Sequence, residues 1–245
     1  AMHEHCCSGI PRNKKLEMAY HSVSLYDSDG IRGWFYCLPA TQISFVNNIV
    51  TLANYLPAQA VPVIAEWIET YQCQFKITRN RATKLGDYRA PYNGLGHRIS
   101  INSGLNPYAF LVTTVHEFAH LITWNAHQHK VKPHGQEWKS NFKKLMYPFL
   151  EMLVFPDDIK HAICIYLQNP SASSCTDLNL MRVMQQYDQP TETIKVENLA
   201  ADHLFAIPNG RVFRKQQLVR KRYRCVEIKT GRVYLFNPLA DIKPI

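Results

Sequence analysis

Two histidines and a glutamate stand at metal-ligand spacing near the middle of the chain, in the run His116-Glu117-Phe118-Ala119-His120. Residues four apart share one face of an α-helix, so both imidazoles can reach a single tetrahedral cation such as Zn²⁺. Glu117 is rotated by about a quarter turn from His116, which brings its carboxylate beside the metal without making it a ligand. The pattern predicts a metal site with a general base; the alternative is a pair of ordinary histidines on an amphipathic helix.

A catalytic zinc site needs a third protein ligand. A third ligand six residues after His120 is excluded, because position 126 is an alanine. His127 is also excluded, because on a continued helix it would lie about 10.5 Å along the axis from His120, too far to share the ion. His134 is the best candidate, because it stands between Pro133 and Gly135, where the chain can reverse over the helix. The alternatives that remain open are His129, Glu137 and Glu151.

Three neutral imidazoles leave the ion its full charge, so that it can acidify a bound water and polarise a carbonyl. Glu117 would take the proton of this zinc-activated water and pass it to a leaving amine, which suits peptide-bond hydrolysis. A structural zinc site is disfavoured because no fourth ligand stands at motif spacing. We expect one Zn²⁺ per chain and a protein substrate, although three imidazoles also suit other divalent ions.

The elements that must hold this motif can be read from periodicity and turn signals. Asn106-Pro107 predicts the start of the motif helix, which should run to about Asn125. Residues 86–90 and 97–102 flank Asn93-Gly94 and predict a β-hairpin ahead of it. Further helices are predicted near residues 42–56, after 62, after 136 and over 157–167, with Pro148 ending or kinking the helix that begins near 136. The expected fold class is α+β, with helices around a small antiparallel sheet.

The hairpin also suggests how a substrate binds. The strand at residues 97–102 should present a free edge beside the metal, where a polypeptide adds through main-chain hydrogen bonds. Ile99 and Ile101 are the candidate substrate residues on this edge.

Charge is strongly segregated along the chain. Residues 203–245 hold ten Lys and Arg against two acidic residues, a balance of +8, whereas the other 202 residues hold eighteen against seventeen. This asymmetry predicts DNA or another polyanion as a partner of the C-terminal segment, with a solvated surface as the alternative. Phe213 or Tyr223 could stack on bases. The candidate phosphate-binding residues are Arg211, Arg214, Lys215, Arg220, Lys221, Arg222 and Arg224.

Composition bounds the domain plan and the compartment. We expect an N-terminal extension of unknown role at residues 1–40, a metallopeptidase domain at 41–188 and a β-rich basic unit at 203–245. No apolar run approaches the roughly 20 residues of a membrane span, and the first residues show no signal peptide, so no membrane is expected as a partner. Seven scattered cysteines suit a reducing, cytoplasmic location.

The segment from Val115 to Trp138 resembles the SprT-like family, whose pattern is HExxH followed by a distant His-Gly and a nearby Trp. The similarity extends over about residues 42–188 and includes KLGDYR at 84–89 and RISIN at 98–102. It implies a minimal zincin fold with zinc on His116, His120 and His134 and with Glu117 as general base. The related Spartan proteases cleave proteins crosslinked to DNA in a DNA-dependent manner.

The C-terminal segment departs from the family pattern, because many members end in a four-cysteine zinc ribbon. Residues 203–245 contain only Cys225 and His203 as such ligands, too few to close a structural zinc site. We expect a metal-free β-unit held together by Phe205, Phe213, Tyr223, Tyr234 and Phe236. The main rival function is a nucleic-acid-associated, transcription-related factor with a structural or vestigial zinc site; a zinc hydrolase acting on a non-protein substrate is a third.

Overall fold

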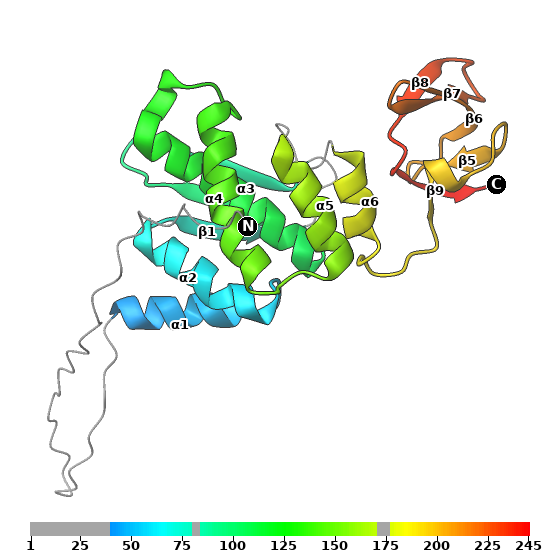
Figure 1. Cartoon of the computed structure of the whole chain (residues 1–245). Coiled ribbons are helices and arrows are strands. Elements are labelled where there is room, and N and C mark those ends of the chain that lie inside the picture. Colours follow the sequence, from blue (N-terminus) through cyan, green and yellow to red (C-terminus); the bar gives the residue numbers. More distant parts are fainter. Residues whose placement is uncertain (1–39, 80–83, 171–176) are drawn as a thin grey trace, which may run out of the picture. The chain divides into compact units, whose positions relative to one another are not determined.

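The structure is a computed structural model that describes residues 40–79, 84–170 and 177–245 (Figure 1). The extension predicted for residues 1–40 lies outside the described residues, apart from its last one. The fold class is α+β, as predicted: a small sheet with helices is followed by a second, larger sheet. None of the described helices is both long enough and apolar enough to cross a bilayer. The domain boundaries stay predictions.

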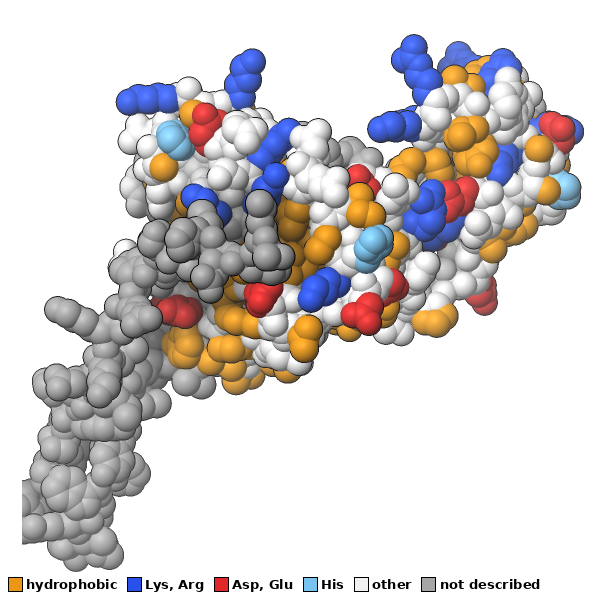
Figure 2. Space-filling model, in the orientation of Figure 1, with side chains coloured by type: hydrophobic (Ala, Val, Ile, Leu, Met, Phe, Trp, Pro, Cys, Tyr) orange, Lys and Arg blue, Asp and Glu red, His pale blue; other side chains and the backbone are white. Residues whose placement is uncertain are grey.

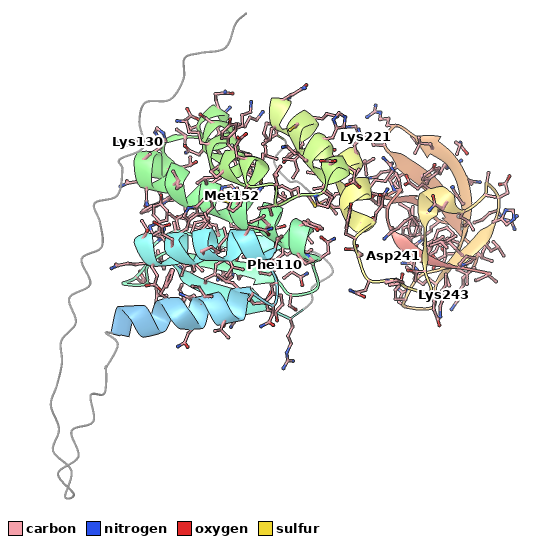
Figure 3. The ribbon with its side chains drawn as sticks, turned by 60° about the horizontal axis from the view of Figure 1, so that its bottom comes forward. Phe110, Lys130, Met152, Lys221, Asp241 and Lys243 are labelled. Atoms are coloured by element: carbon pink, nitrogen blue, oxygen red, sulfur yellow. The ribbon has the colours of Figure 1, made fainter. Side chains whose placement is uncertain are left out.

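Six α-helices and three short 3₁₀ helices occur among the described residues. In Figures 1 and 3, α1 and α2 lie side by side, and Asn48 of α1 donates a hydrogen bond to Glu69 of α2 (2.9 Å). The bounds are α1 Ala40–Leu52, η1 Ala58–Ala60, α2 Val61–Thr70, α3 Pro107–His127, η2 Gln128–Lys130, α4 Gln136–Glu151, α5 Asp157–Gln168, α6 Leu178–Gln185 and η4 Val196–Asn198.

Helix α3 is the central element of the first core. Asn106 caps it, since its side chain accepts hydrogen bonds from the backbone N–H groups of Tyr108 and Ala109, and Pro107 occupies the first helical position. Every residue from Ala109 to Ala119 is buried, so α3 is surrounded by other elements rather than covered along one stripe. Phe110, labelled in Figure 3, is fully buried in this core.

Three strands form a small mixed sheet in the order β1-β3-β2. Their bounds are β1 Gln74–Thr78, β2 Gly86–Arg89 and β3 Arg98–Asn102. The β2–β3 pair is the predicted antiparallel hairpin, and Asn93 and Gly94 both have positive φ (48° and 77°), as a type I′ turn requires. The sheet is not purely antiparallel, however, because β1 pairs with β3 in parallel. The chain crosses from β1 to the far side of β3 before forming β2, so β3 returns in the direction of β1.

This strand order corrects the predicted position of the substrate edge. Strand β3 is central, with β1 on one side and β2 on the other, so its backbone groups are already paired. Ile99 and Ile101 are 1% and 0% exposed and point into the core. They cannot present a free edge to a peptide; the edge strands are β1 and β2.

Helix α4 packs against α3 and is tied to it by a hydrogen bond from Asn141 to the Thr123 hydroxyl (2.9 Å). Pro148 lies inside α4 and the helix continues to Glu151, so of the two predicted alternatives the proline does not end the helix at once, and a kink stays a prediction. A proline removes one intrahelical hydrogen bond, and so close to the end of a helix only the last turn is affected.

The second sheet has six strands, all antiparallel, in the order β4-β9-β5-β6-β7-β8. Its buried core includes Phe205 and Phe213, with Tyr223, Tyr234 and Phe236 packed against it, which confirms the predicted aromatic core. Val196, which precedes residue 203, also belongs to this core. The bounds are β4 Ile194–Lys195, β5 Leu204–Ala206, β6 Val212–Val219, β7 Arg222–Glu227, β8 Val233–Phe236 and β9 Asp241–Pro244.

Candidate metal centre

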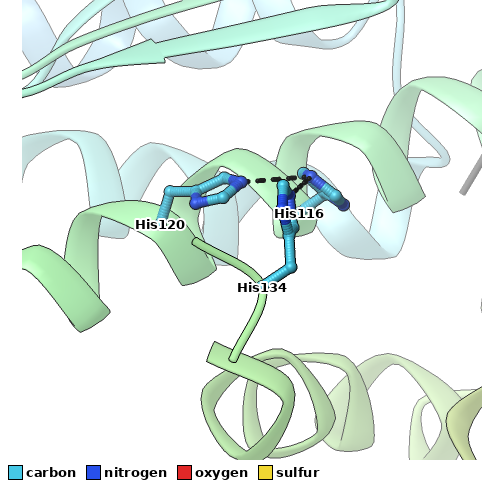
Figure 4. A group of neighbouring side chains, drawn as sticks. All are labelled: His116, His120 and His134. Carbon is cyan, nitrogen blue, oxygen red and sulfur yellow. Dashed lines mark hydrogen bonds between the residues drawn. The ribbon is translucent and has the colours of Figure 1, made fainter. Parts of the chain in front are cut away.

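Three histidines converge at the junction of α3 and α4 (Figure 4). The Nε2 atom of His116 lies 3.2 Å from Nε2 of His120 and 3.2 Å from Nε2 of His134. Among the described residues, these three form the group of His, Cys, Asp and Glu side chains that could hold a metal ion. The residue chosen as third ligand by its place after the turn therefore lies beside the helical pair.

The donor set fits a tetrahedral divalent cation. Zn–N bonds of about 2.0–2.1 Å at tetrahedral angles place ligand nitrogens roughly 3.3–3.4 Å apart, close to the separations found here. Burial lowers the pKa of His116 to about 3 and of His120 to about 4, and it also lowers the pKa of His134. All three rings are therefore neutral near pH 7, which is the form that binds a metal.

A tight turn delivers His134 to the helical pair. The backbone N–H of Gly135 donates to the carbonyl of Lys132 (2.9 Å), and His134 has φ of 59°, in the left-handed region. With Pro133 at the second position, this matches a type II turn, whose third position favours Gly or Asn. A histidine there costs about 1–2 kcal/mol. Strained residues of this kind cluster at functional sites, where the surrounding structure holds them in place.

Trp138, in the first turn of α4, supports all three imidazoles. Its ring centroid lies 4.6 Å from that of His116, 5.5 Å from that of His120 and 4.7 Å from that of His134. The side chain is fully buried and stacks on Phe142 at 5.1 Å. The histidines are thus packed against a rigid wall that limits their side-chain rotation.

Glu117 is buried beside the histidine group, with 7% of its surface exposed. The pKa of its carboxyl is raised to about 8, mainly by burial and in addition by the nearby Asp87 carboxylate. Lys84 and a hydrogen bond with the backbone of Tyr88 act in the opposite direction. A carboxyl with a pKa near neutrality can both accept and return a proton, which is the requirement for a general base that later serves as an acid.

The edge strand β2 borders both Glu117 and the histidines. Gly86 lies so close to Glu117 that a Cβ added to it would collide with the carboxylate. Two residues further on, the ring of Tyr88 is parallel to that of His120 at 6.2 Å between centroids. The Tyr88 hydroxyl shares a hydrogen bond with Nδ1 of His97 (3.0 Å). Strand β2 therefore forms one wall of the site.

A cavity of about 270 Å³ opens beside the histidines, on the side of Tyr88. Its lining includes His120 and His134, together with aromatic, apolar and basic side chains from the end of α3, the α3–α4 connection and the start of α4. Those residues are Trp124, His129, Val131, Lys132, Pro133 and Trp138. The cavity thus borders the metal group at His120 and His134, where it has room for part of a substrate.

The other residues considered as third ligand are not in the metal group. His129 lines the cavity, while Glu137 and Glu151 lie elsewhere on α4. Sequence reasoning did not single out Gly86 and Tyr88, although a glycine inside a strand signals a close backbone approach.

Two of the proposed phosphate-binding residues are engaged within the C-terminal sheet instead. Lys215 is 4% exposed, and its ammonium group donates to the carbonyls of Leu199 and Glu197 and lies 4.1 Å from the Tyr223 ring centroid. Arg211 donates to the Glu227 carboxylate (2.7 Å) and covers the Tyr234 ring at 4.6 Å.

These contacts correct the nucleic-acid prediction for Lys215, because a buried ammonium group held by backbone carbonyls cannot reach a phosphate. Arg211 is only partly exposed and is already paired with Glu227. Phe213 is fully buried and cannot stack on a base. The other proposed residues lie outside the core, four exposed and Arg224 half-buried. Figure 2 shows blue Lys and Arg side chains on this unit with hydrophobic ones between them. The four exposed residues among those predicted to bind phosphate are Arg214, Arg220, Lys221 and Arg222.

Residues 65–161 match the SprT-like family. The match takes in the small sheet, α3 and α4, and with them the three histidines and Glu117. The C-terminal sheet lies beyond it. No curated protein and no solved structure matches the chain.

Proposed function

We propose that this chain, whose residues 65–161 form a SprT-like family domain, is a zinc-dependent metallopeptidase that hydrolyses peptide bonds. The observation that carries the proposal is the convergence of three neutral imidazoles next to a buried carboxyl that is not one of them. His116, His120 and His134 would hold the ion, and Glu117 would be the general base.

A bound Zn²⁺ would supply Lewis acidity, which polarises a carbonyl and makes a water molecule easier to deprotonate. The chain's own residues would handle the proton. Glu117 takes it from the attacking water and returns it to the leaving amine, which its pKa of about 8 permits near neutral pH. Trp138 keeps the three imidazoles in position during this cycle.

The substrate would be a polypeptide bound to the free edge of β2. This replaces the edge first assigned to β3. Asn102 donates to the carbonyl of Leu85 across the ladder, so the alternation of an antiparallel pair leaves the backbone groups of Gly86 and Tyr88 facing outward. The N–H of Tyr88 is bonded to Glu117, and the remaining outward-facing groups would pair with the peptide. Gly86 and Tyr88 are also the residues that contact Glu117 and His120. An extended peptide added here would pass the metal site through main-chain contacts, with weak sequence preference.

Backbone pairing of this kind can be tested with a peptide substrate that is N-methylated at one position at a time. Each methyl group removes one main-chain N–H donor. Because alternate residues of a strand face the partner, kcat/KM should fall at every second position near the scissile bond. Equal losses at consecutive positions would exclude pairing with β2.

The experiment that tests the proposed function compares the wild-type chain with Glu117→Gln and Glu151→Gln. Glu151 is an exposed glutamate at the end of α4 and serves as a matched control. All three proteins should contain equal zinc, and only Glu117→Gln should lose cleavage of casein, histone and the chain itself. Activity that survives Glu117→Gln would exclude this residue as the base. The assay is run with and without single- and double-stranded DNA.

The rival function, a nucleic-acid-associated factor with a structural zinc site, is less well supported by the site. Structural zinc is closed by four protein ligands, whereas the group found among the described residues has three. A buried carboxyl beside an open coordination position has a use in hydrolysis and none in a closed site.

Association with nucleic acid through the C-terminal sheet is a separate proposal. It rests on Arg214, Arg220, Lys221 and Arg222, which are exposed and form no ion pair within the described part of the chain. Their charges would contact phosphates and not bases, so binding should weaken steeply with salt. The double variant Arg220→Glu/Arg222→Glu should lower affinity for an oligonucleotide; unchanged affinity would remove this surface from the proposal.

A further inference from the structure

The small sheet has a second face, turned away from α3. Side chains alternate along a strand, and the inner set packs on α3, as shown by Phe75, whose ring stacks on Phe118 at 6.5 Å. The other set borders a hollow of about 360 Å³. We call this set the outer sheet face; its members are Gln74, Lys76 and Thr78 of β1, Arg98 and Ser100 of β3, and Asp87 and Arg89 of β2.

The outer sheet face is basic and rich in hydrogen-bond donors. It carries three cationic side chains against the single carboxylate of Asp87. Asp87 is already bonded to Lys84 (2.5 Å) and to Arg89 (2.9 Å), which lower the pKa of its carboxyl against the effect of burial. Lys76 and Arg98 have no carboxylate partner among the described residues. The surrounding sequence has the same bias, with six Lys and Arg against one acidic residue over 76–98.

Two arginines of this face oppose each other directly. Arg89 of β2 and Arg98 of β3 are register partners in the antiparallel ladder. Like charges at directly opposite positions destabilise a sheet, and the Asp87 carboxylate, which is bonded to Arg89, offsets only one of the two positive charges. The Nε atom of Arg98 is also buried and makes no hydrogen bond in the described structure. Arg89 donates through its Nε to Asp87, and Arg98 donates through one terminal nitrogen to the Ala90 carbonyl (3.2 Å). An anion lying over the two guanidinium groups would offset their charges and accept from their remaining terminal N–H groups.

We propose that the outer sheet face binds the phosphate backbone of nucleic acid. Guanidinium groups match the geometry of phosphate oxygens, and hydroxyl and amide side chains such as Ser100, Thr78 and Gln74 are common partners of phosphates. The hairpin that carries Arg89 and Arg98 ends in Tyr92, whose side chain is 70% exposed. An exposed aromatic beside basic residues suits a nucleic acid, on whose bases it can stack, better than an acidic peptide.

The placement has a consequence that rests on the proposed function. The inner face of the same strands reaches Glu117 and His120 through Gly86 and Tyr88. Nucleic acid on the outer face would therefore be separated from the metal site by one layer of sheet. A protein attached to that nucleic acid would be held near the edge of β2.

Binding is measured with the full chain and a fluorescently labelled single-stranded oligonucleotide, by anisotropy over a series of salt concentrations. The test variant is Lys76→Glu/Arg89→Glu. The control is Lys143→Glu/Lys144→Glu on α4, which changes net charge equally and alters residues that are also exposed. Zinc content and the midpoint of thermal unfolding verify folding, and Lys76→Gln/Arg89→Gln is used if the reversal variant does not fold.

On a single strand each phosphate contact contributes about 0.7 to the slope of log K against log salt. The loss of two contacts should therefore lower the slope by about 1.4, and it should lower the affinity at 0.1 M salt by roughly 25-fold. The control should stay within about twofold. Equal losses in test and control would mean a general effect of net charge and would overturn the proposal. Binding that depends only on Arg220 and Arg222 would also overturn the proposal. Displacement of the labelled oligonucleotide by polyglutamate as readily as by unlabelled oligonucleotide would overturn it too, because it would indicate an acidic peptide as the ligand. None of these readouts depends on peptidase activity.

Discussion

Replacing Gly86 with alanine should disable the proposed general base without removing the metal. A Cβ at this position would collide with the carboxylate of Glu117 and would lie 2.8 Å from Cγ2 of Thr113 and 2.9 Å from Cγ of Glu117. Its three nearest neighbours all belong to Thr113 and Glu117, and none of them to a histidine of the metal group. Zinc binding and catalysis should therefore respond separately to this one methyl group.

The expected magnitude follows from these distances. Carbon atoms in contact normally lie about 3.5–4.0 Å apart, so Glu117 or β2 has to move by roughly 0.5–1 Å. A displacement of about 1 Å at a reacting group can lower the rate by about 100-fold. Overpacking of this kind also costs about 1–3 kcal/mol of stability. We expect kcat/KM to fall about 100-fold, with a modest drop in the unfolding midpoint.

The assay measures kcat/KM on a peptide together with zinc per chain, for the wild type, Gly86→Ala and Gly96→Ala. Gly96 is the matched control, because the nearest atom to an added Cβ is the Gln72 carbonyl oxygen at 3.9 Å, an ordinary contact. The double variant Gly86→Ala/Thr113→Ser removes one of the clashing methyl groups and should recover part of the activity. Near-normal kcat/KM in Gly86→Ala with full zinc would refute the argument that β2 positions Glu117.

Three further predictions concern strain, protonation and the C-terminal sheet. His134→Asn should abolish zinc retention yet raise the unfolding midpoint of the metal-free protein, by relieving up to about 1 kcal/mol of left-handed strain; a lower midpoint contradicts this. For metal-free protein in chelator, the raised pKa of Glu117 means that the folded state binds the proton more tightly, so stability is lost as pH rises from about 4.5 through about 8. Glu117→Gln should therefore raise the unfolding midpoint more at pH 9 than at pH 5, and a pH-independent difference would refute it. Lys215→Ala should lower the unfolding midpoint of the C-terminal sheet but leave the salt slope of oligonucleotide binding unchanged, because its ammonium group is bonded to carbonyls of the chain; a slope reduced by about 0.7 would show a phosphate contact instead.

Features of this chain that depend on neighbouring residues could be predicted from the sequence. The start of α3 follows from Asn106 and Pro107, whose capping and fixed φ act within one turn. The shared face of His116 and His120 follows from helical geometry alone, and the β2–β3 hairpin follows from the positive φ that Asn93 and Gly94 tolerate. The turn signals of Pro133 and Gly135 likewise predicted His134 as the favoured third member of the group.

Other features were decided only by the tertiary structure, since they depend on which strands and side chains meet across the fold. Periodicity cannot tell a central strand from an edge strand, and only the return of β3 beside β1 showed that Ile99 and Ile101 are enclosed and that β2 borders Glu117. The sequence shows that Arg211 and Lys215 are charged, but only the packing of the C-terminal sheet gave them internal partners. Local geometry thus determined the chemical groups of the site, whereas long-range pairing determined which backbone and which charges remain free to meet a substrate.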